Sequence, residues 1–196
     1  MRKQLHVVFS RMENPLILQL SLDERPVSEE LRHYAETLAG LTDRLQIQFR
    51  AEGEDAPCVR ILRADGSDTG LAFHGVPGGH EFTSFVLGLY NAAGPGQPLE
   101  PEWKERIDGL APVDLKVLVS LSCTMCPELV MAAQKMAAVH PGIRAEVYDM
   151  NHFPQLREKY QVMSVPCLVI NGGQKITFGK KNIRQLTEFL EKNREG

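Results

Sequence analysis

One pattern of strands and helices occurs twice along this chain of 196 residues, and this repeat constrains the fold more than any other feature. The first half contains the apolar segment PLILQLSL at 15–22 and then APCVRILRADG at 56–66. The second half contains DLKVLVSL at 114–121 and VPCLVINGG at 165–173, in the same order. Because a helical stretch and another strand lie between the members of each pair, the sequence predicts two small α/β units in tandem.

Each unit is predicted to be a βαβ element followed by a β-hairpin and a helix, which makes a mixed sheet with flanking helices. In the first half we expect strands at Asn14–Leu22, Leu45–Phe49, Pro57–Leu62 and about Leu71–Phe73, with helices from the N-cap Ser28 to Gly40 and from about Gly79 to Asn91. In the second half we expect strands at Asp114–Leu121, Ile143–Met150, Pro166–Ile170 and Lys175–Phe178, with helices at Cys123–His140, Gln155–Tyr160 and Asn182–Lys192. The Gly- and Pro-rich segment Ala92–Pro101 marks the junction, so the domains are predicted at 1–95 and 96–196.

Composition and charge exclude several classes of function. A net charge of -3 provides no basic surface for nucleic acid or anionic lipid, and no apolar run approaches the roughly 18 residues of a membrane span. The basic N-terminus reads as an amphipathic helix and has no small-residue cleavage site, so we expect no signal peptide. Four cysteines are too few for a disulfide scaffold in a chain of this length. These features predict a soluble cytoplasmic protein.

Cys123 and Cys126, in the segment SLSCTMCPEL, directly follow a predicted strand and begin a predicted helix. A structural zinc site needs four ligands, but the other cysteines, Cys58 and Cys167, stand alone in strand patterns. A purely structural disulfide would close too short a loop to stabilise much, and a cytoplasm would reduce it. A helix N-terminus instead favours the thiolate of Cys123 and lets Cys126 resolve a mixed disulfide. Redox chemistry is therefore the preferred interpretation, ahead of zinc and a structural disulfide.

Pro166, in the segment SVPCL, opens a strand that is predicted to lie beside this helix. In thioredoxin-like folds a cis proline at this place lies against the disulfide, and the preceding residue, here Val165, offers its backbone to an incoming chain. The alternative is an ordinary proline at the start of a strand. With a Cys-x-x-Cys pair upstream, the cis assignment is preferred.

Three segments resemble one protein family: FHGVPGGHEFTSFVLGLY, SLSCTMCPELVMAAQKMAAVHP and VMSVPCLVINGG. Across nearly the whole chain they are similar to the N-terminal module of the flavoprotein subunit of bacterial alkyl hydroperoxide reductase. That module consists of two tandem thioredoxin-like folds with mixed central sheets flanked by helices, so the resemblance implies this fold class. It also implies a thiol-disulfide oxidoreductase that passes electrons from a thioredoxin-reductase-like flavoprotein to an AhpC-type peroxiredoxin.

The chain departs from that family in length. The family's flavoprotein continues into domains that bind FAD and NAD(P)H, whereas this chain stops at Gly196 and has no G-x-G-x-x-G fingerprint. We therefore expect no cofactor on this chain, and FAD and NAD(P)H only on a partner or a further domain. The chain is either a domain of a longer flavoprotein or a free-standing carrier, and the sequence leaves both open.

The first half lacks the cysteine pair, because aligning the strand ends puts Glu24 and Val27 in its place. Thioredoxins usually bury a carboxylate in the strand before the motif, but that position here is Val117. The resemblance implies that Glu81, on a helix of the other half, supplies the missing acid across the junction. The alternative is a first-turn glutamate that the helix dipole favours.

The remaining candidate residues are predicted either to assist the cysteine pair or to have structural roles. Thr124 and Met125 lie between the cysteines and are predicted to tune the redox potential and contact the partner. Met125 and Val165 are predicted to form an apolar rim that docks a peroxiredoxin. Cys58 and Cys167 are expected to be buried and inert. His74 and His80, which flank the glycine loop, are expected at the surface or in loop packing.

Other functions also remain open. One alternative is a protein disulfide oxidoreductase or isomerase, as in the two-domain enzymes of thermophilic archaea, which the chain also resembles. Those enzymes carry active cysteines in both halves, which this chain lacks. A non-catalytic docking module predicts that Cys126→Ser leaves function intact, whereas a carrier would stall as a mixed disulfide. Metal binding through the two thiols predicts stoichiometric zinc in the purified protein.

Overall fold

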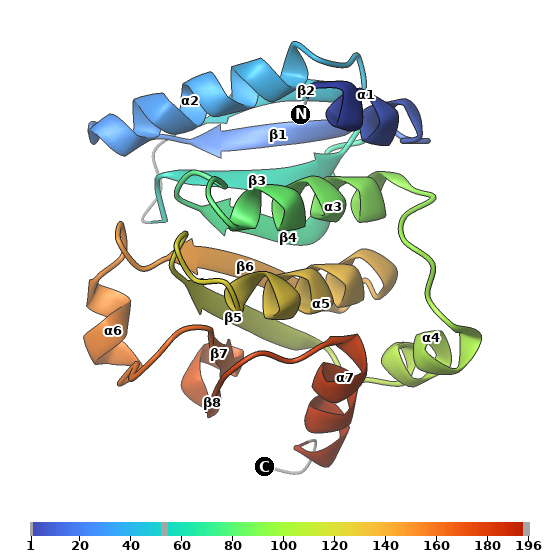
Figure 1. Ribbon diagram of the computed structural model, residues 1–196, viewed down its shortest axis with the longest axis vertical. Coiled ribbons are helices and arrows are strands. Elements are labelled where there is room, and N and C mark those ends of the chain that lie inside the picture. Colours follow the sequence, from blue (N-terminus) through green and yellow to red (C-terminus); the bar gives the residue numbers. More distant parts are fainter. Residues whose placement is uncertain (1, 52–54, 194–196) are drawn as a thin grey trace.

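The computed structural model describes residues 2–51 and 55–193, and the strands within these ranges form one eight-stranded sheet. The strand order is β2-β1-β3-β4-β6-β5-β7-β8, so each half of the chain contributes one side of the sheet (Figure 1). Among the described residues, no helix combines the length and apolar character that a membrane crossing requires.

The predicted strands and long helices all form, with ends that shift by up to three residues. The first half consists of α1 (Arg2–Ser10), β1 (Leu16–Ser21), α2 (Pro26–Ala39), β2 (Leu45–Arg50), β3 (Cys58–Arg63), β4 (Asp68–His74) and α3 (Glu81–Ala93). The second half consists of α4 (Pro101–Asp108), β5 (Val113–Val119), α5 (Cys126–Val139), β6 (Ile143–Asp149), α6 (Gln155–Lys159), β7 (Cys167–Ile170), the 3-10 turn η1 (Asn171–Gly173), β8 (Lys175–Phe178) and α7 (Ile183–Lys192).

The two halves share one strand arrangement. In each half the first strand pairs in parallel with the second and antiparallel with the third, and the third and fourth form an antiparallel hairpin. This confirms the α/β fold class. The two units also join edge to edge, because β4 pairs in parallel with β6 from Leu71 opposite Ala145 to His74 opposite Tyr148. The repeat did not predict this continuous sheet, and the domain boundary at 95/96 stays a prediction.

The main hydrophobic core lies between the sheet and the helices on one of its faces, and a second core lies under α6 on the other face of the second half. Helices α3 and α5 lie side by side over the middle of the sheet (Figure 1). The predicted apolar stripe of α5 is buried in the main core and consists of Leu129, Val130, Ala133, Met136 and Ala137. Burying a Leu, Val or Met side chain contributes about 1.5–3 kcal/mol, so this stripe anchors α5 to the sheet.

One prediction about the helices was wrong, and one helix was missed. Ser28 is not the N-cap of α2, because the helix begins at Pro26 with Arg25 as its extended N-cap residue. A proline fits the first helical turn, since the N–H that it lacks has no intrahelical acceptor there. Helix α4 was also not predicted, because its segment follows the Gly- and Pro-rich junction. Its buried residues Trp103 and Ile107 hold it against the rest of the second half.

His74 is completely buried at the seam between the two halves, so of the surface and loop-packing roles expected for it the surface one was wrong. Its ring stacks on Tyr148 with 3.8 Å between the ring centroids. Its Nε2 atom lies 3.7 Å from Glu146 Oε2 and 3.8 Å from the sulfur of Cys58. Arg60, from the first half, also donates to Glu146 at 2.6 Å. Charged and aromatic side chains therefore join the halves in addition to the β4–β6 backbone pairing.

Candidate active site

A disulfide joins Cys123 and Cys126 just beyond the carboxyl end of β5, with 5.5 Å between the Cα atoms. β5 ends at Val119 and α5 begins at Cys126, so the helix starts three residues later than predicted and Cys123 lies in the turn before it. Pro127 lies in the first turn of α5, where the missing backbone N–H costs no intrahelical hydrogen bond. This local sequence places both sulfurs at the amino end of the helix.

The two cysteines differ in exposure. Cys126 is completely buried, whereas Cys123 is partly exposed. The backbone N–H of Cys126 donates to the sulfur of Cys123 at 3.1 Å, and it belongs to the first turn, whose N–H groups lack intrahelical acceptors. This N–H and the helix dipole both stabilise negative charge on the Cys123 sulfur. Cys123 is therefore the sulfur that an incoming protein can reach.

The predicted cis peptide bond between Val165 and Pro166 is present. The sulfur of Cys123 lies 3.9 Å from the carbonyl oxygen of Val165. Cys167, the next residue, is completely buried, as was predicted. Burial also raises the pKa of the Cys167 thiol to about 11, so it is protonated at neutral pH.

Several residues close in sequence to the disulfide and to Pro166 are exposed or partly exposed. Met125 is 51% exposed, Thr124 is exposed and Val165 is partly buried, so all three are accessible at this surface. Met163 is 80% exposed and precedes Val165 by two residues. Sequence reasoning missed Met163, because a methionine outside any periodic segment carries no signal of its exposure. The partner-binding roles of these residues stay predictions.

Glu81 is the first residue of α3, and its side chain has 0% exposure. Ser84 donates a hydrogen bond to its Oε2 atom, whereas Oε1 has no hydrogen-bond partner among the described residues. Burial raises the pKa of Glu81 to about 7, although the hydrogen bond from Ser84 acts in the opposite direction. A first-turn glutamate that only served the helix dipole would be expected at the surface. Glu81 is instead a buried acid near neutrality.

The loop before α3 touches the turn that carries the disulfide. The backbone N–H of His80 donates to the carbonyl oxygen of Leu121 at 3.0 Å. Gly79 has a positive φ of 53°, and a Cβ at this position would lie 2.6 Å from the same oxygen. Since Leu121 precedes Cys123 by two residues, this contact holds the start of α3 against the active-site turn.

Helices α3 and α5 run side by side (Figure 1), and contacts further along them continue this arrangement. The side chain of Gln134 lies against the backbone of Gly88, and Lys135 Nζ donates to Asn91 Oδ1 at 3.2 Å. Gly88 thus lies opposite Gln134, and counting seven residues toward the start of each helix puts Glu81 level with the first turn of α5. Glu81 and the buried cysteine therefore lie at the same end of the α3–α5 pair.

Known proteins share this arrangement. The thioredoxin domain family model matches residues 113–191. The AhpF protein of Pseudomonas aeruginosa, a component of alkyl hydroperoxide reductase, is 35% identical over 175 residues, which make up 88% of this chain. The crystal structure of the NTD_N/C domain of alkylhydroperoxide reductase AhpF from Enterococcus faecalis matches with a TM-score of 0.92 and 33% identity, over 97% of each chain. The chain belongs to this family of AhpF N-terminal domains.

The match has limits in length and in identity. The chain spans about a third of the curated relatives it matches, for example 33% of the Pseudomonas aeruginosa protein. A protein disulfide oxidoreductase from Aeropyrum pernix matches all of this chain and 92% of its own, with a TM-score of 0.83 but 23% identity, so it supports the fold alone. The chain is therefore a thiol oxidoreductase domain of the AhpF family, with a thioredoxin fold and a Cys-x-x-Cys disulfide.

The first fold of this AhpF-family domain has no thiol at the corresponding place. Matching the start of α2 with the start of α5 puts Asp23 at the place of the first cysteine and Pro26 at that of the second. Aligning the strand ends instead gives Glu24 and Val27, one residue further along, and these matches stay a prediction. The absence of a cysteine pair holds in both alignments. A cis peptide bond precedes Pro57, as it precedes the proline of the second fold.

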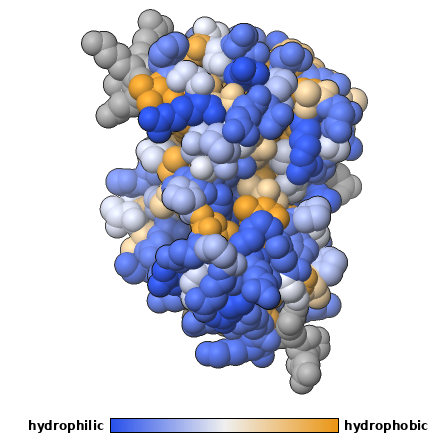
Figure 2. All heavy atoms as spheres, turned by 90° about the vertical axis from the view of Figure 1, so that its right-hand side faces the viewer, coloured by the Kyte–Doolittle hydropathy of each residue, from blue (hydrophilic) through white to orange (hydrophobic). Residues whose placement is uncertain are grey.

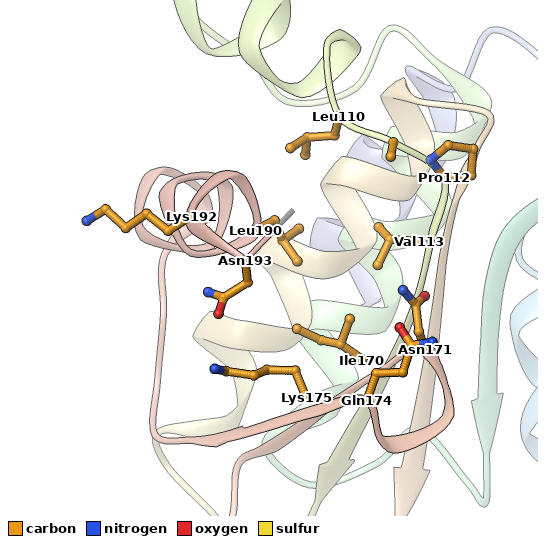
Figure 3. Close-up of a pocket in the computed structure, with 11 residues that line it drawn as sticks. Leu110, Pro112, Val113, Ile170, Asn171, Gln174, Lys175, Leu190, Lys192 and Asn193 are labelled. Atoms are coloured by element: carbon orange, nitrogen blue, oxygen red, sulfur yellow. The ribbon is translucent and has the colours of Figure 1, made fainter. Parts of the chain in front are cut away.

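A cavity of about 630 Å³ lies away from this redox site. It opens at the amino end of β5, between the β7–β8 hairpin and the end of α7 (Figure 3). Its lining consists of Leu110, Ala111, Pro112, Val113, Ile170, Asn171, Gln174, Lys175, Leu190, Lys192 and Asn193. The side of the molecule that faces right in Figure 1, away from the start of α5, is mainly hydrophilic, with small hydrophobic patches (Figure 2). Because the disulfide follows the carboxyl end of β5, the cavity takes no part in the redox site.

Metal coordination through the two thiols would need further ligands close to them. Within the two described ranges, no three His, Cys, Asp or Glu side chains come together in an arrangement that could hold a metal ion.

Proposed function

We propose that the chain is a dithiol electron carrier, which takes electrons from a thioredoxin-reductase-like flavoprotein and passes them to an AhpC-type peroxiredoxin. The observation that carries this proposal is the disulfide at the start of α5, with Cys123 accessible beside the Val165 backbone. In this proposal FAD and NAD(P)H are bound by the flavoprotein partner or by a further domain, and the carrier works in the reducing cytoplasm.

Reduction of the peroxiredoxin takes two exchange steps. The Cys123 thiolate attacks one sulfur of the peroxiredoxin disulfide, which forms a mixed disulfide and releases the other sulfur as a thiolate. Cys126 then loses its proton and attacks the Cys123 sulfur, which closes the intramolecular disulfide and releases the second peroxiredoxin sulfur. Two electrons have then moved to the peroxiredoxin, whose two thiolates take up two protons from solvent, while the proton lost by Cys126 passes to a base within the domain.

The flavoprotein restores the dithiol by the same chemistry in reverse. A thiolate of its reduced dithiol attacks the exposed sulfur, Cys123, and Cys126 leaves as the thiolate. The second flavoprotein thiol then resolves the mixed disulfide and frees Cys123. Accessible Cys123 and buried Cys126 support this division of roles, since the attacked sulfur must be within reach of the partner.

Glu81 is proposed to hold the proton of Cys126 between the two half-cycles. Its burial and its pKa of about 7 support this role, because a carboxyl group with a pKa near the working pH both accepts and returns a proton. The register of α3 against α5 puts this carboxyl level with the first turn that contains Cys126.

The partner chain is proposed to pair with the backbone at Val165, beside Pro166, in the manner of an added β-strand. Thr124, Met125 and Met163 are then proposed to contact the partner's side chains. The exposure of Met125, next to Cys126, and of Met163, two residues before Val165, supports this, since large exposed apolar side chains suit a protein partner.

A coupled reduction assay tests the proposal. The reduced flavoprotein, an oxidised peroxiredoxin, a hydroperoxide and NAD(P)H are mixed with the chain, and NAD(P)H consumption is followed. Consumption should require the chain and disappear with Cys123→Ser. The matched control, Cys167→Ser, removes a buried thiol outside the disulfide and should keep the activity.

Two other results would contradict the carrier. No turnover, together with a disulfide potential far above the thioredoxin value of roughly -270 mV, would indicate an oxidase or isomerase. Full activity of Cys126→Ser would indicate a docking module, because the resolving step would then be unnecessary.

A further inference from the structure

Arg25 occupies the place in the first fold that corresponds to the active site of the second. It is the N-cap residue of α2, directly before the helix. One guanidinium nitrogen, Nη2, donates to the carbonyl oxygen of Ala56 at 2.5 Å, and the other, Nη1, donates to that of His152 at 3.0 Å. Its Nε atom donates to Asp23 Oδ2 at 2.8 Å, and the guanidinium carbon lies 5.6 Å from the centre of the Phe153 ring.

The carbonyl of Ala56 corresponds to that of Val165. Each precedes the proline that comes directly before the third strand of its unit, β3 or β7. In the second fold, the Val165 carbonyl faces the sulfur of Cys123 at 3.9 Å. An extended chain that pairs with such an edge donates a backbone N–H to this carbonyl. In the first fold, the guanidinium of Arg25 already makes that hydrogen bond.

We propose that the first fold retains a second chain-binding edge at Ala56, and that Arg25 closes this edge from within the molecule. The partner that the edge fits is an extended polypeptide segment held by main-chain hydrogen bonds. The guanidinium donates the first of these hydrogen bonds, so the carbonyl of Ala56 has a hydrogen-bond donor in the absence of a partner. This inference rests on the shared fold of the two units and not on the proposed electron transfer.

Asp23 keeps Arg25 in this position. Its Oδ1 atom accepts hydrogen bonds from the Ser28 hydroxyl at 2.6 Å and from the Arg25 backbone N–H at 3.0 Å, which leaves Oδ2 for the guanidinium. In the alignment of helix starts, this carboxylate takes the place of the first cysteine, and it orients the residue that closes the edge. The Arg25 side chain is 44% exposed, so its removal disturbs no part of the core.

The bond from Arg25 to the His152 carbonyl also connects this closed edge to the second half. His152 lies in the segment between β6 and α6, and the backbone N–H of Met150 in the same segment donates to Val119 at the end of β5 at 2.9 Å. One side chain therefore closes the first fold's edge and ties it to a loop beside the active-site strand.

Disulfide tethering tests whether Ala56 belongs to a chain-binding edge. In a Cys123→Ser/Cys126→Ser background, Glu24→Cys places an exposed thiol beside Arg25 without altering Asp23. This thiol is equilibrated in mercaptoethanol buffer with a pentapeptide of alternating Val and Thr linked through an N-terminal cysteine. Cystamine serves as a probe that is not a chain, and intact-mass spectrometry measures the fraction tethered.

Adding Arg25→Ala is expected to raise the peptide-to-cystamine tethering ratio at least fivefold. A peptide with proline at the donating positions should show no gain, because it lacks the N–H groups that pair with the edge. The matched control is Arg44→Ala, which removes another guanidinium that donates to a backbone carbonyl, that of Glu13 at 3.3 Å, at the opposite end of the sheet. It should leave the ratio unchanged.

An unchanged ratio with Arg25→Ala would overturn the proposal, and so would an equal gain for the proline peptide. Arg25→Met keeps the aliphatic stem over Phe153 and removes only the donors, so it decides the question if the alanine variant unfolds. Since the background lacks both active cysteines, the outcome is independent of the reduction assay.

Discussion

Replacing Glu81 by glutamine should stabilise the chain at alkaline pH while it impairs the chemistry. The ordinary pKa of this carboxyl is 4.5, and burial raises it to about 7 in the folded chain. The folded state therefore favours the protonated form, and ionisation costs stability as the pH rises from 4.5 through 7. One pKa unit corresponds to about 1.36 kcal/mol, so the full cost above pH 7 is about 3 kcal/mol. Glutamine has the same shape and no charge, and it escapes this cost.

Urea unfolding of the oxidised chain at pH 5 and pH 8 measures this effect. Between these two values, the unfolding free energy of Glu81→Gln relative to wild type should rise by about 2–3 kcal/mol. The control is Glu29→Gln, also in the first turn of a helix but 77% exposed at its side chain, which should show no such rise. A difference for Glu81→Gln that does not change with pH would refute the assignment of Glu81 as a buried titrating acid.

The same variant connects this stability effect to the proposed function. If Glu81 accepts the proton of Cys126, Glu81→Gln should slow resolution of the mixed disulfide by about 100-fold, the usual scale of general acid–base catalysis. Stopped-flow measurement across pH 6–9 checks this, since the variant should lose the inflection near pH 7. An unchanged rate and pH profile would restrict Glu81 to a structural role.

Three further outcomes are expected. Cys126→Ser should accumulate a mixed disulfide with the peroxiredoxin, visible on non-reducing gels and absent with Cys123→Ser. Burial lowers the pKa of His74, but its contacts with the Cys58 sulfur and Glu146 outweigh burial and raise that pKa from 6.5 to about 9. The positive charge of His74 therefore stabilises the fold in full below pH 6.5, and this stabilisation is lost as the pH rises through 9. The stability advantage of wild type over His74→Gln, measured by urea unfolding, should accordingly shrink by about 3 kcal/mol over this range. Gly79→Ala should destabilise the fold by about 1–3 kcal/mol in the same assay, because of its positive φ and the 2.6 Å approach to a carbonyl, whereas Gly78→Ala, with nothing closer than 3.9 Å, should be nearly neutral.

The fold class and the main site were predictable because their signals are local in the sequence. Alternating and continuous apolar segments identify strands, and the two cysteines lie only three positions apart. The proline of SVPCL marks the strand beside them. Helix starts were less predictable: α2 begins before Ser28 and α5 begins after Cys123, since a proline in the first turn and the contacts of each loop decide the first helical residue.

The sequence by itself determined two tandem α/β units, one with a redox pair and one without, because these properties depend on residue type and spacing. Only the tertiary structure decided how the units meet. The pairing of β4 with β6, the complete burial of Glu81 and the hydrogen bond from Arg25 to His152, 127 residues away, all depend on contacts between distant segments. No periodicity encodes such contacts, because the residue type of a glutamate is the same whether its side chain is buried or exposed, and only the fold determines its surroundings.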